Sequence, residues 1–220
     1  MSVSLRWDGK LSTPFRVEQG TRQGELSSPF LFNIFYKELI DSLSLCTSGI
    51  TVNGNTYNAF CYADDVLLAS LTPSGLQGLI DKASDVISKL GLRFNPSKTK
   101  CMMYGPNPFS STPTWSLGGT TLCREDALTY LGSGLAMDGG AYHVESRIKS
   151  AYKAFYALQN AGLHFGNCKP EVASHVFSMG VQTVLLFGGE TIYLSKKSIR
   201  RLTTTQDNLV KATLGLRRSS

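Results

Sequence analysis

The residues with the clearest capacity for chemistry are two adjacent acids, Asp64 and Asp65, at a polar break between two apolar segments. They follow Tyr62 and Ala63, and both flanking segments have the composition of short strands. Neighbouring carboxylates are costly to bury unless a cation or strong hydrogen-bond donors compensate. The pair therefore fits a site for Mg²⁺, which prefers hard oxygen ligands and substrate phosphates. An ordinary solvent-exposed turn is the alternative, and these four residues alone do not decide between the two.

Turn dipeptides on either side of a helical segment predict that the acids belong to a group of β-hairpins. Residues 3–19 alternate apolar and polar around Asp8-Gly9, and residues 50–70 contain Asn53-Gly54. Both dipeptides favour tight hairpin turns. We expect a hairpin at the start of the chain, a second one around Asn53, and the acids at a further break between strands.

Two helices are expected to support these strands. Ser28 is predicted to cap the first, with Pro29 at its first helical position, where a missing N–H is harmless. The apolar residues at helical spacing in this segment are Phe30, Leu31, Ile34, Phe35 and Leu39. A clearer amphipathic helix starts at Thr72-Pro73 and ends at Gly91.

Beyond about residue 141 the pattern becomes helical. Val144, Ile148, Ala151, Phe155 and Leu158 share one face, and Arg147, Lys149 and Lys153 share another, toward solvent or a ligand. A last helix is predicted from Ser195 to Gly215. The expected fold class is α+β, with strands and helices in front and helices behind.

Composition limits the classes of protein to which the chain can belong. Of its 220 residues, 42% are hydrophobic, enough for a core, and its net charge of +6 lies mostly after Gly105 and suits a polyanionic partner. Five widely spaced cysteines without a CxxC pair indicate neither a disulfide framework nor a zinc ribbon. Without an apolar run long enough for a membrane span or a signal peptide, we expect an intracellular protein, nuclear or cytoplasmic, with no membrane partner.

Four segments, taken in order, resemble the motifs lettered B, C, D and E of the reverse transcriptase palm. They are GTRQGELSSPFLFNIFYKEL from Gly20, YADDVLLA from Tyr62, GLRFNPSKTKCMMYG from Gly91 and YLGSGL from Tyr130. The RQGxxxSPxLFN form and the YLG resemble reverse transcriptases of non-LTR (LINE-like) retrotransposons more than retroviral ones. The stretch from Val176 to Leu216 is similar to the thumb and connector of the same group.

The resemblance implies an RNA-directed DNA polymerase that uses two Mg²⁺ ions, an RNA template, a DNA primer and deoxynucleoside triphosphates. Asp64 and Asp65 match the metal-binding acids, with Asp64 the more direct ligand, and Lys98 matches a lysine that neutralises phosphate charge or donates a proton to pyrophosphate. Tyr130 to Gly132 match the primer grip. The residues implied to contact nucleic acid or nucleotide are Arg22, Gln23, Gly24, Tyr62, Asn95, Tyr130, Leu131, Gly132, Arg147 and Lys153.

The chain departs from the family pattern at motif A, whose aspartate supplies another metal ligand. The residues before Gly20 contain a single aspartate, Asp8, and it lies at a predicted hairpin turn. Motif A and the fingers are therefore expected to be missing. The resemblance thus predicts a partial palm over 1–135, an antiparallel sheet backed by helices, and a thumb-like helical region over 136–220. We expect little activity from this chain alone, and a separate N-terminal polymerase half is a candidate partner. The alternatives are a non-catalytic nucleic-acid-binding remnant and a decayed fragment of a retroelement.

Overall fold

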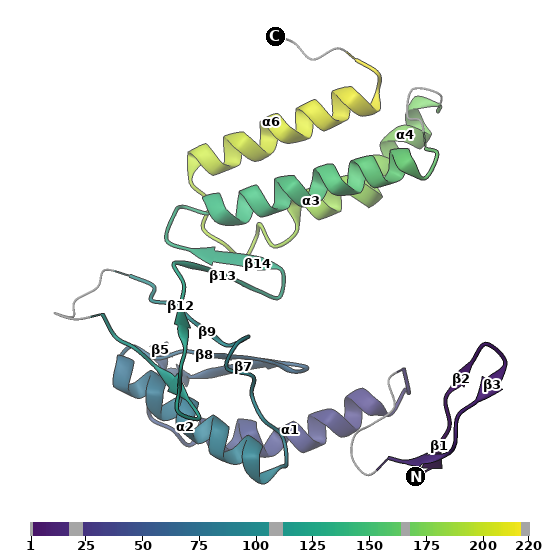
Figure 1. Cartoon of the computed structure of the whole chain (residues 1–220). Coiled ribbons are helices and arrows are strands. Elements are labelled where there is room, and N and C mark those ends of the chain that lie inside the picture. The colour runs from purple at the N-terminus through teal and green to yellow at the C-terminus, as the bar shows by residue number, and fades with distance from the viewer. Residues whose placement is uncertain (1, 18–23, 106–111, 164–167, 217–220) are drawn as a thin grey trace. The chain divides into compact units, whose positions relative to one another are not determined.

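The computed structural model describes residues 2–17, 24–105, 112–163 and 168–216, and its fold is α+β, as predicted. Figure 1 shows short paired strands together with longer helices. The chain forms two compact units, Met1–Asn95 with Trp115–Thr120 (unit 1), and Pro96–Thr114 with Thr121–Ser220 (unit 2). The division into palm and thumb at residue 135 stays a prediction, because compactness alone does not define those regions.

The predicted hairpins at the start of unit 1 are confirmed. Asp8 and Gly9 have φ values of 47° and 73°, and Asn53 and Gly54 have 51° and 81°. Two consecutive left-handed residues form the tight turn whose twist matches that of paired strands. The strands are β1 (Ser2–Val3) with β4 (Phe15–Arg16), β2 (Arg6–Trp7) with β3 (Lys10–Leu11), and β5 (Ile50–Val52) with β6 (Asn55–Tyr57).

Two helices form the core of unit 1. They are α1 (Ser28–Ser44) and α2 (Pro73–Lys89). As predicted, Thr72 caps α2: its side chain accepts a hydrogen bond from the Gly75 N–H at 3.1 Å. The buried side chains between the helices are Tyr36, Leu39, Leu43, Leu79, Ala83, Val86 and Ile87. A short strand, β10 (Ser116–Leu117), is fixed to α2 through Gln77, whose side chain bonds both the N–H and the carbonyl of Ser116.

Helix α1 is present as predicted, but its N-cap was predicted one residue too late. The N-cap is Ser27 rather than Ser28, and it makes no side-chain capping bond. Of the five apolar residues expected at helical spacing, only Leu39 is buried, and the exposed ones are Phe30, Leu31, Ile34 and Phe35. The buried face instead consists of Tyr36, Leu39 and Leu43, which contact α2. Helix α1 is therefore apolar on two faces, and periodicity alone could not tell which face packs within this chain.

In unit 2, short strands precede the helices along the chain. Strand β9 (Lys100–Cys101) pairs in parallel with β12 (Cys123–Arg124), supported by an ion pair of 3.1 Å between Lys100 and Glu125. Strand β13 (Ala127–Tyr130) pairs antiparallel with β14 (Ser133–Ala136). The second pair is the hairpin that carries the predicted primer grip. Strand β11 (Thr120–Thr121) pairs with β10.

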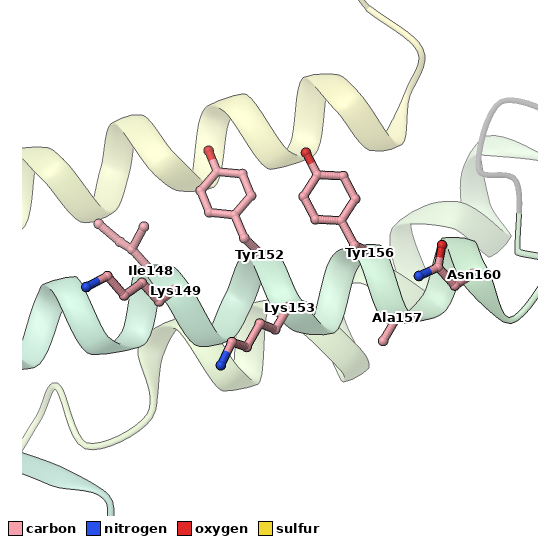
Figure 2. Close-up of a pocket in the computed structure, with 7 residues that line it drawn as sticks. All are labelled: Ile148, Lys149, Tyr152, Lys153, Tyr156, Ala157 and Asn160. Atoms are coloured by element: carbon pink, nitrogen blue, oxygen red, sulfur yellow. The ribbon is translucent and has the colours of Figure 1, made fainter.

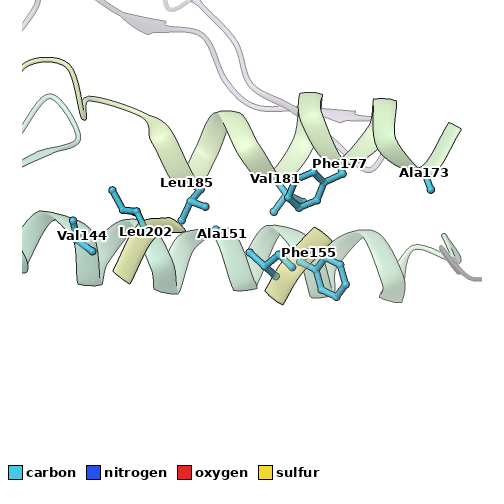
Figure 3. Close-up of a cluster of buried hydrophobic side chains, with 9 residues drawn as sticks. Val144, Ala151, Phe155, Ala173, Phe177, Val181, Leu185 and Leu202 are labelled. Atoms are coloured by element: carbon cyan, nitrogen blue, oxygen red, sulfur yellow. The ribbon is translucent and has the colours of Figure 1, made fainter. Parts of the chain in front are cut away.

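The core of unit 2 lies between its helices, as Figure 3 shows. Helix α3 (Ala141–Asn160) buries Val144, Ala151 and Phe155, as its periodicity predicts. The last helix, α6 (Lys196–Thr213), starts at the predicted cap Ser195 and buries Leu202 and Leu209. The third layer was not predicted in detail: it is α4 (Pro170–Phe177), a π-helical turn (Ser178–Gln182) and α5 (Thr183–Leu186).

Among the described residues, none of the helices combines the length and apolar character that crossing a membrane requires.

Candidate nucleic-acid and metal site

The two acids lie at the tip of a hairpin in unit 1. Strands β7 (Ala59–Tyr62) and β8 (Asp65–Leu68) pair antiparallel, with Tyr62 opposite Asp65, so that Ala63 and Asp64 form the turn. Ala63 has a φ of 49°, a left-handed conformation that costs a non-glycine residue roughly 1–2 kcal/mol. All four tip residues are exposed. The tip thus presents two carboxylates to solvent on a sharply turned backbone, and such local strain is common at functional sites.

Apolar packing fixes this acidic hairpin against the two helices. Ala59, Val66 and Leu68 lie on the buried cluster of α1 and α2. Asn58, just before β7, is buried and donates from its amide to the Leu43 carbonyl at 2.7 Å and to the Cys46 carbonyl at 3.2 Å. The end of α1 and the start of the hairpin are therefore joined by a satisfied polar contact, which favours one defined orientation of the hairpin on its helices.

A tyrosine on α1 lies within electrostatic range of the acids. Burial raises the pKa of Tyr36, and the charges of Cys61 and Asp64 raise it further. The Tyr36 ring also stacks on Phe32, with 4.5 Å between ring centroids. Burial and neighbouring negative charge therefore keep the Tyr36 phenol in its protonated form.

The donor chemistry of the tip fits part of a divalent-cation site. Carboxylate oxygens are the ligands that Mg²⁺ prefers, and Asp64 and Asp65 supply them from consecutive, exposed positions. Within the described residues, no cluster of three or more His, Cys, Asp or Glu side chains could enclose a metal ion. The acids therefore suit a site in which other groups, including substrate phosphates, complete the ligand set.

The other residues predicted in unit 1 are placed in part. Arg22 and Gln23 lie outside the described residues. Gly24 has a φ of 83°, which a side chain would disfavour, although no atom lies near its Cβ position. Tyr62 is 65% exposed beside the acids, so its ring is free to contact a ligand, and Asn95 is exposed at the end of the unit.

In unit 2, the predicted primer-grip residues occupy the β13–β14 turn. Leu131 and Gly132 have φ values of 48° and 80° between Tyr130 and Ser133, which pair with each other. Leu131 is 42% exposed, so its side chain is not required to fill the core. A branched apolar residue at a left-handed position, exposed at a hairpin tip, is unfavourable for stability.

Replacing Leu131 with asparagine is expected to raise the free energy of unfolding by about 1 kcal/mol, because asparagine followed by glycine is the preferred pair for this turn. Chemical denaturation monitored by circular dichroism measures the change. The reciprocal control is Asn53→Leu, which places leucine at the corresponding position of the β5–β6 turn, where φ is 51°. The free energy of unfolding of Asn53→Leu should fall by about the same amount. A lower free energy of unfolding in Leu131→Asn would show that the left-handed conformation does not strain Leu131.

Two predicted basic residues of unit 2 differ in their surroundings. Lys98 is exposed in a turn before β9, and its predicted role stays a prediction. Arg147 was expected to face solvent or a ligand; its guanidinium lies over the Phe187 ring, 5.5 Å from the centroid, and its Nε is buried without a hydrogen-bond partner. Packing against Phe187 therefore holds the half-buried Arg147 side chain, and its predicted contact with nucleic acid stays a prediction.

A surface pocket of about 540 Å³ lies along α3 and includes Lys153. Its lining is formed by Ile148, Lys149, Tyr152, Lys153, Tyr156, Ala157 and Asn160. Figure 2 shows the two tyrosine rings on the side of α3 where α6 runs, with Lys153 projecting away from them. The rings stack at 6.3 Å between centroids, and Tyr156 is 53% exposed. Aromatic faces beside lysines are the combination that binds nucleic acid by stacking and phosphate contact.

Further basic residues extend this face of unit 2. Lys149 forms an ion pair of 2.8 Å with Glu145, and the pKa of Glu145 is lowered by Lys149 and, more weakly, by the charge of Arg201 on α6. Lys196, Lys197, Arg200 and Arg201 are all exposed at the start of α6. The positive charge of α3 therefore continues onto α6.

Sequence reasoning missed both tyrosines of the pocket, together with Ala157 and Asn160, and one buried histidine. The i, i+4 spacing of Tyr152 and Tyr156 next to lysines was the available signal for the pocket. His143, which is 2% exposed, gave no signal in the sequence, because its partners are backbone groups distant along the chain.

Comparison with known proteins identifies the family to which the chain belongs. The family model described as "Reverse transcriptase (RNA-dependent DNA polymerase)" matches residues 1–135. The chain belongs to the reverse transcriptase family. Within that family it is similar to two proteins of R2 retrotransposable elements, which supports the predicted non-LTR type.

The first relative is the Retrovirus-related Pol polyprotein from type-2 retrotransposable element R2DM of Drosophila melanogaster. It is 39% identical over 96 residues, which are 44% of this chain and 9% of the relative. The second, from type-1 retrotransposable element R2 of Bradysia coprophila, is 33% identical over 105 residues, covering 48% of this chain and 12% of the relative. The matched segments thus span about a tenth of these relatives.

Proposed function

We propose that this chain contributes the metal-binding acids and the primer-holding part of an RNA-directed DNA polymerase of a non-LTR retrotransposon. The observation that carries the proposal is the acidic tip of the β7–β8 hairpin, with Asp64 and Asp65 exposed on a strained turn that two helices support. Nucleotidyl transfer needs carboxylates held at a fixed position and open to substrate, and this hairpin meets both needs.

In this proposal Asp64 and Asp65 hold divalent cations, which reverse transcriptases generally use, and we infer that the cation is Mg²⁺. When bound, the metal supplies Lewis-acid stabilisation of the charge that develops at the reacting phosphate. Lys98 neutralises charge on, or donates a proton to, the departing pyrophosphate. Arg22, Gln23, Gly24, Tyr62 and Asn95 contact template or nucleotide, and Tyr130 to Gly132 position the primer end.

The proposed partners are an RNA template, a DNA primer, deoxynucleoside triphosphates and the N-terminal part of the polymerase. The exposed apolar face of α1 supports the last of these, because Phe30, Leu31, Ile34 and Phe35 lie on a helix whose opposite face is already packed. A contiguous exposed apolar face of this kind is typical of an interface. The missing metal ligand would come from the same partner.

Primer extension tests the proposal. The test protein joins this chain to an N-terminal polymerase part that carries motif A, and it is called the full-length protein below. It is supplied with an RNA template, an annealed DNA primer, four deoxynucleotides and Mg²⁺. Extension that stops when the metal is chelated is the expected result. Absence of extension with a protein that carries an intact N-terminal part would overturn the proposal.

The pocket on α3 favours a second candidate function, nucleic-acid binding without catalysis. Lys153→Ala is expected to weaken binding of the chain to a DNA–RNA duplex about threefold to tenfold, and to lower the slope of log K against log salt by about one. Fluorescence anisotropy across a salt series measures both. Chelation of divalent metal should leave this binding unchanged, because Lys153 contacts phosphate directly in this proposal.

Lys89→Ala is the matched control for that measurement. Lys89 is an exposed lysine on α2, paired with Asp85 at 2.8 Å, so the substitution removes the same charge elsewhere on the chain. Its affinity and salt slope should stay near those of the unmodified chain. Equal losses for both variants would show that net charge alone, and not the pocket, determines binding.

A further inference from the structure

The β13–β14 hairpin is seated on α3 and on the segment after α5 through glycines that leave no space for a side chain. A Cβ on Gly134 would lie 2.8 Å from the Tyr142 ring and 3.0 Å from the His143 Cα. A Cβ on Gly132 would lie 2.9 Å from the Phe187 ring, and one on Gly188 would lie 2.6 Å from the Ser133 Oγ. The backbone of the hairpin therefore approaches its support more closely than other residues would permit.

His143 joins the three segments at this contact. Its Nδ1 accepts a hydrogen bond from the Gly134 N–H at 3.0 Å, and its ring also makes a backbone hydrogen bond with Phe187. Since Nδ1 accepts, the ring N–H that forms the hydrogen bond with Phe187 is on Nε2. The ring is therefore the neutral tautomer with its proton on Nε2. The imidazole thus connects β14, α3 and the start of the loop after α5 while it is almost fully buried.

The charges around His143 favour its neutral form. Burial lowers the pKa of His143 most, the Arg147 charge lowers it further, and the Phe187 hydrogen bond and the Glu190 charge oppose them. Strand β14 and helix α5 contain no titratable residue. The neutral ring therefore stabilises the fold fully above the ordinary histidine pKa of about 6.5, and this contribution is lost as pH falls through the lower folded value.

Protonation would change the contact in a specific way. A proton on Nδ1 would place an N–H against the Gly134 N–H, so the acceptor would become a second donor. The same event would place a second positive charge beside Arg147, whose guanidinium already lies over Phe187. The turn formed by Leu131 and Gly132 ends two residues before Gly134 and would lose this attachment to α3.

We propose that neutral His143 is a positioning residue, which holds the Leu131–Gly132 turn against α3 and Phe187 so that the turn can support a primer end. The inference rests on the proposed function of this hairpin. His143 itself touches neither primer nor metal in the proposal; it acts through the backbone of Gly134.

Nitrogen NMR and amide exchange test the attachment without nucleic acid. In the full chain at about pH 7.5, the His143 ring should show an unprotonated Nδ1 and a protonated Nε2, and the Gly134 amide should exchange slowly. His143→Leu should speed Gly134 exchange about fivefold or more, the effect of one buried hydrogen bond, and His143→Asn, which keeps an acceptor near the Nδ1 position, should restore most of the protection. A protonated Nδ1, or unchanged exchange in the leucine variant, would overturn the positioning role.

Binding of duplex ends then tests the consequence. The unmodified chain should bind a DNA–RNA duplex with a recessed primer end more tightly than a blunt duplex. His143→Leu should reduce that preference about fivefold, with blunt-duplex binding unchanged, and His143→Asn should restore it. Acidification to about pH 5 should reduce the preference of the unmodified chain but not that of His143→Leu.

The outcomes separate the two proposals. If the unmodified chain shows no preference for a recessed end, the proposed primer-holding function of the hairpin fails, whatever the NMR result. If the preference exists and survives both His143→Leu and acidification, the function stands and the positioning role of His143 is overturned. If His143→Leu does not fold, the nitrogen NMR of the unmodified chain decides the question, because a protonated Nδ1 overturns the positioning role.

Discussion

Replacing Asp64 with asparagine is expected to lower DNA synthesis by the full-length protein at least about a hundredfold. Asparagine has nearly the same shape and tolerates turn conformations, so the hairpin tip should be retained while one anionic metal ligand is lost. Single-turnover primer extension on an RNA template with Mg²⁺ measures the rate. Because Asp64 is exposed, the free energy of unfolding should change by less than about 0.5 kcal/mol.

Two comparisons make this result specific. Asp65→Asn should also lower synthesis, but less, because Asp64 is predicted to be the more direct ligand. Asp8→Asn is the matched control, since Asp8 is an exposed acid at another hairpin turn, with a φ of 47°. It should leave the rate within about twofold of the unmodified protein. Synthesis by Asp64→Asn at the unmodified rate would remove the basis for the proposed function.

Features encoded by neighbouring residues could be predicted from the sequence. Asp8-Gly9 and Asn53-Gly54 form the expected turns, because left-handed φ values at two consecutive positions are accessible to few residue pairs. Helix α2 begins after Thr72 and ends before Gly91 as predicted, because capping hydrogen bonds form within a few residues of the helix end.

Features that depend on distant partners could not be predicted in this way. Helix α1 has apolar residues on two faces, and only the presence of α2 determines that Leu39 is inside and Ile34 is outside. Likewise, the position of Arg147 depends on Phe187, forty residues away, and the role of Asn58 depends on carbonyls at the end of α1.

The candidate site likewise has features that could be predicted from neighbouring residues and features that could not. The acidic pair and its turn were visible because Asp64 and Asp65 are adjacent, and the resemblance supplied their proposed role. The exposure of the two acids could not be predicted from their apolar flanking residues. It results from their position at the tip of the β7–β8 hairpin. The pocket on α3 emerges only when Tyr152, Lys153 and Tyr156 are placed on a helix with a neighbouring α6.

The second large effect is expected on stability, from the buried cluster between α1 and α2 that supports the acidic hairpin. Leu39→Ala should lower the free energy of unfolding by roughly 2–5 kcal/mol, because the side chain is 0% exposed between α1 and α2 and its removal leaves a cavity. Chemical denaturation of the full chain, monitored by circular dichroism, measures the loss. The same cluster packs against Val66 and Leu68 of β8, so the tip carrying Asp64 should become more mobile as well.

Ile34→Ala is the control on the same helix, because Ile34 is 57% exposed and removing its side chain leaves no cavity in this chain. Its free energy of unfolding should stay within about 0.5 kcal/mol of the unmodified value. In the full-length protein the same substitution should cost more than about 1 kcal/mol if the N-terminal part of the polymerase covers this face of α1. Equal losses of unfolding free energy from Leu39→Ala and Ile34→Ala in the 220-residue chain would contradict the buried and exposed faces assigned to α1. An unchanged free energy of unfolding for Ile34→Ala in the full-length protein would contradict the proposed contact with the N-terminal part.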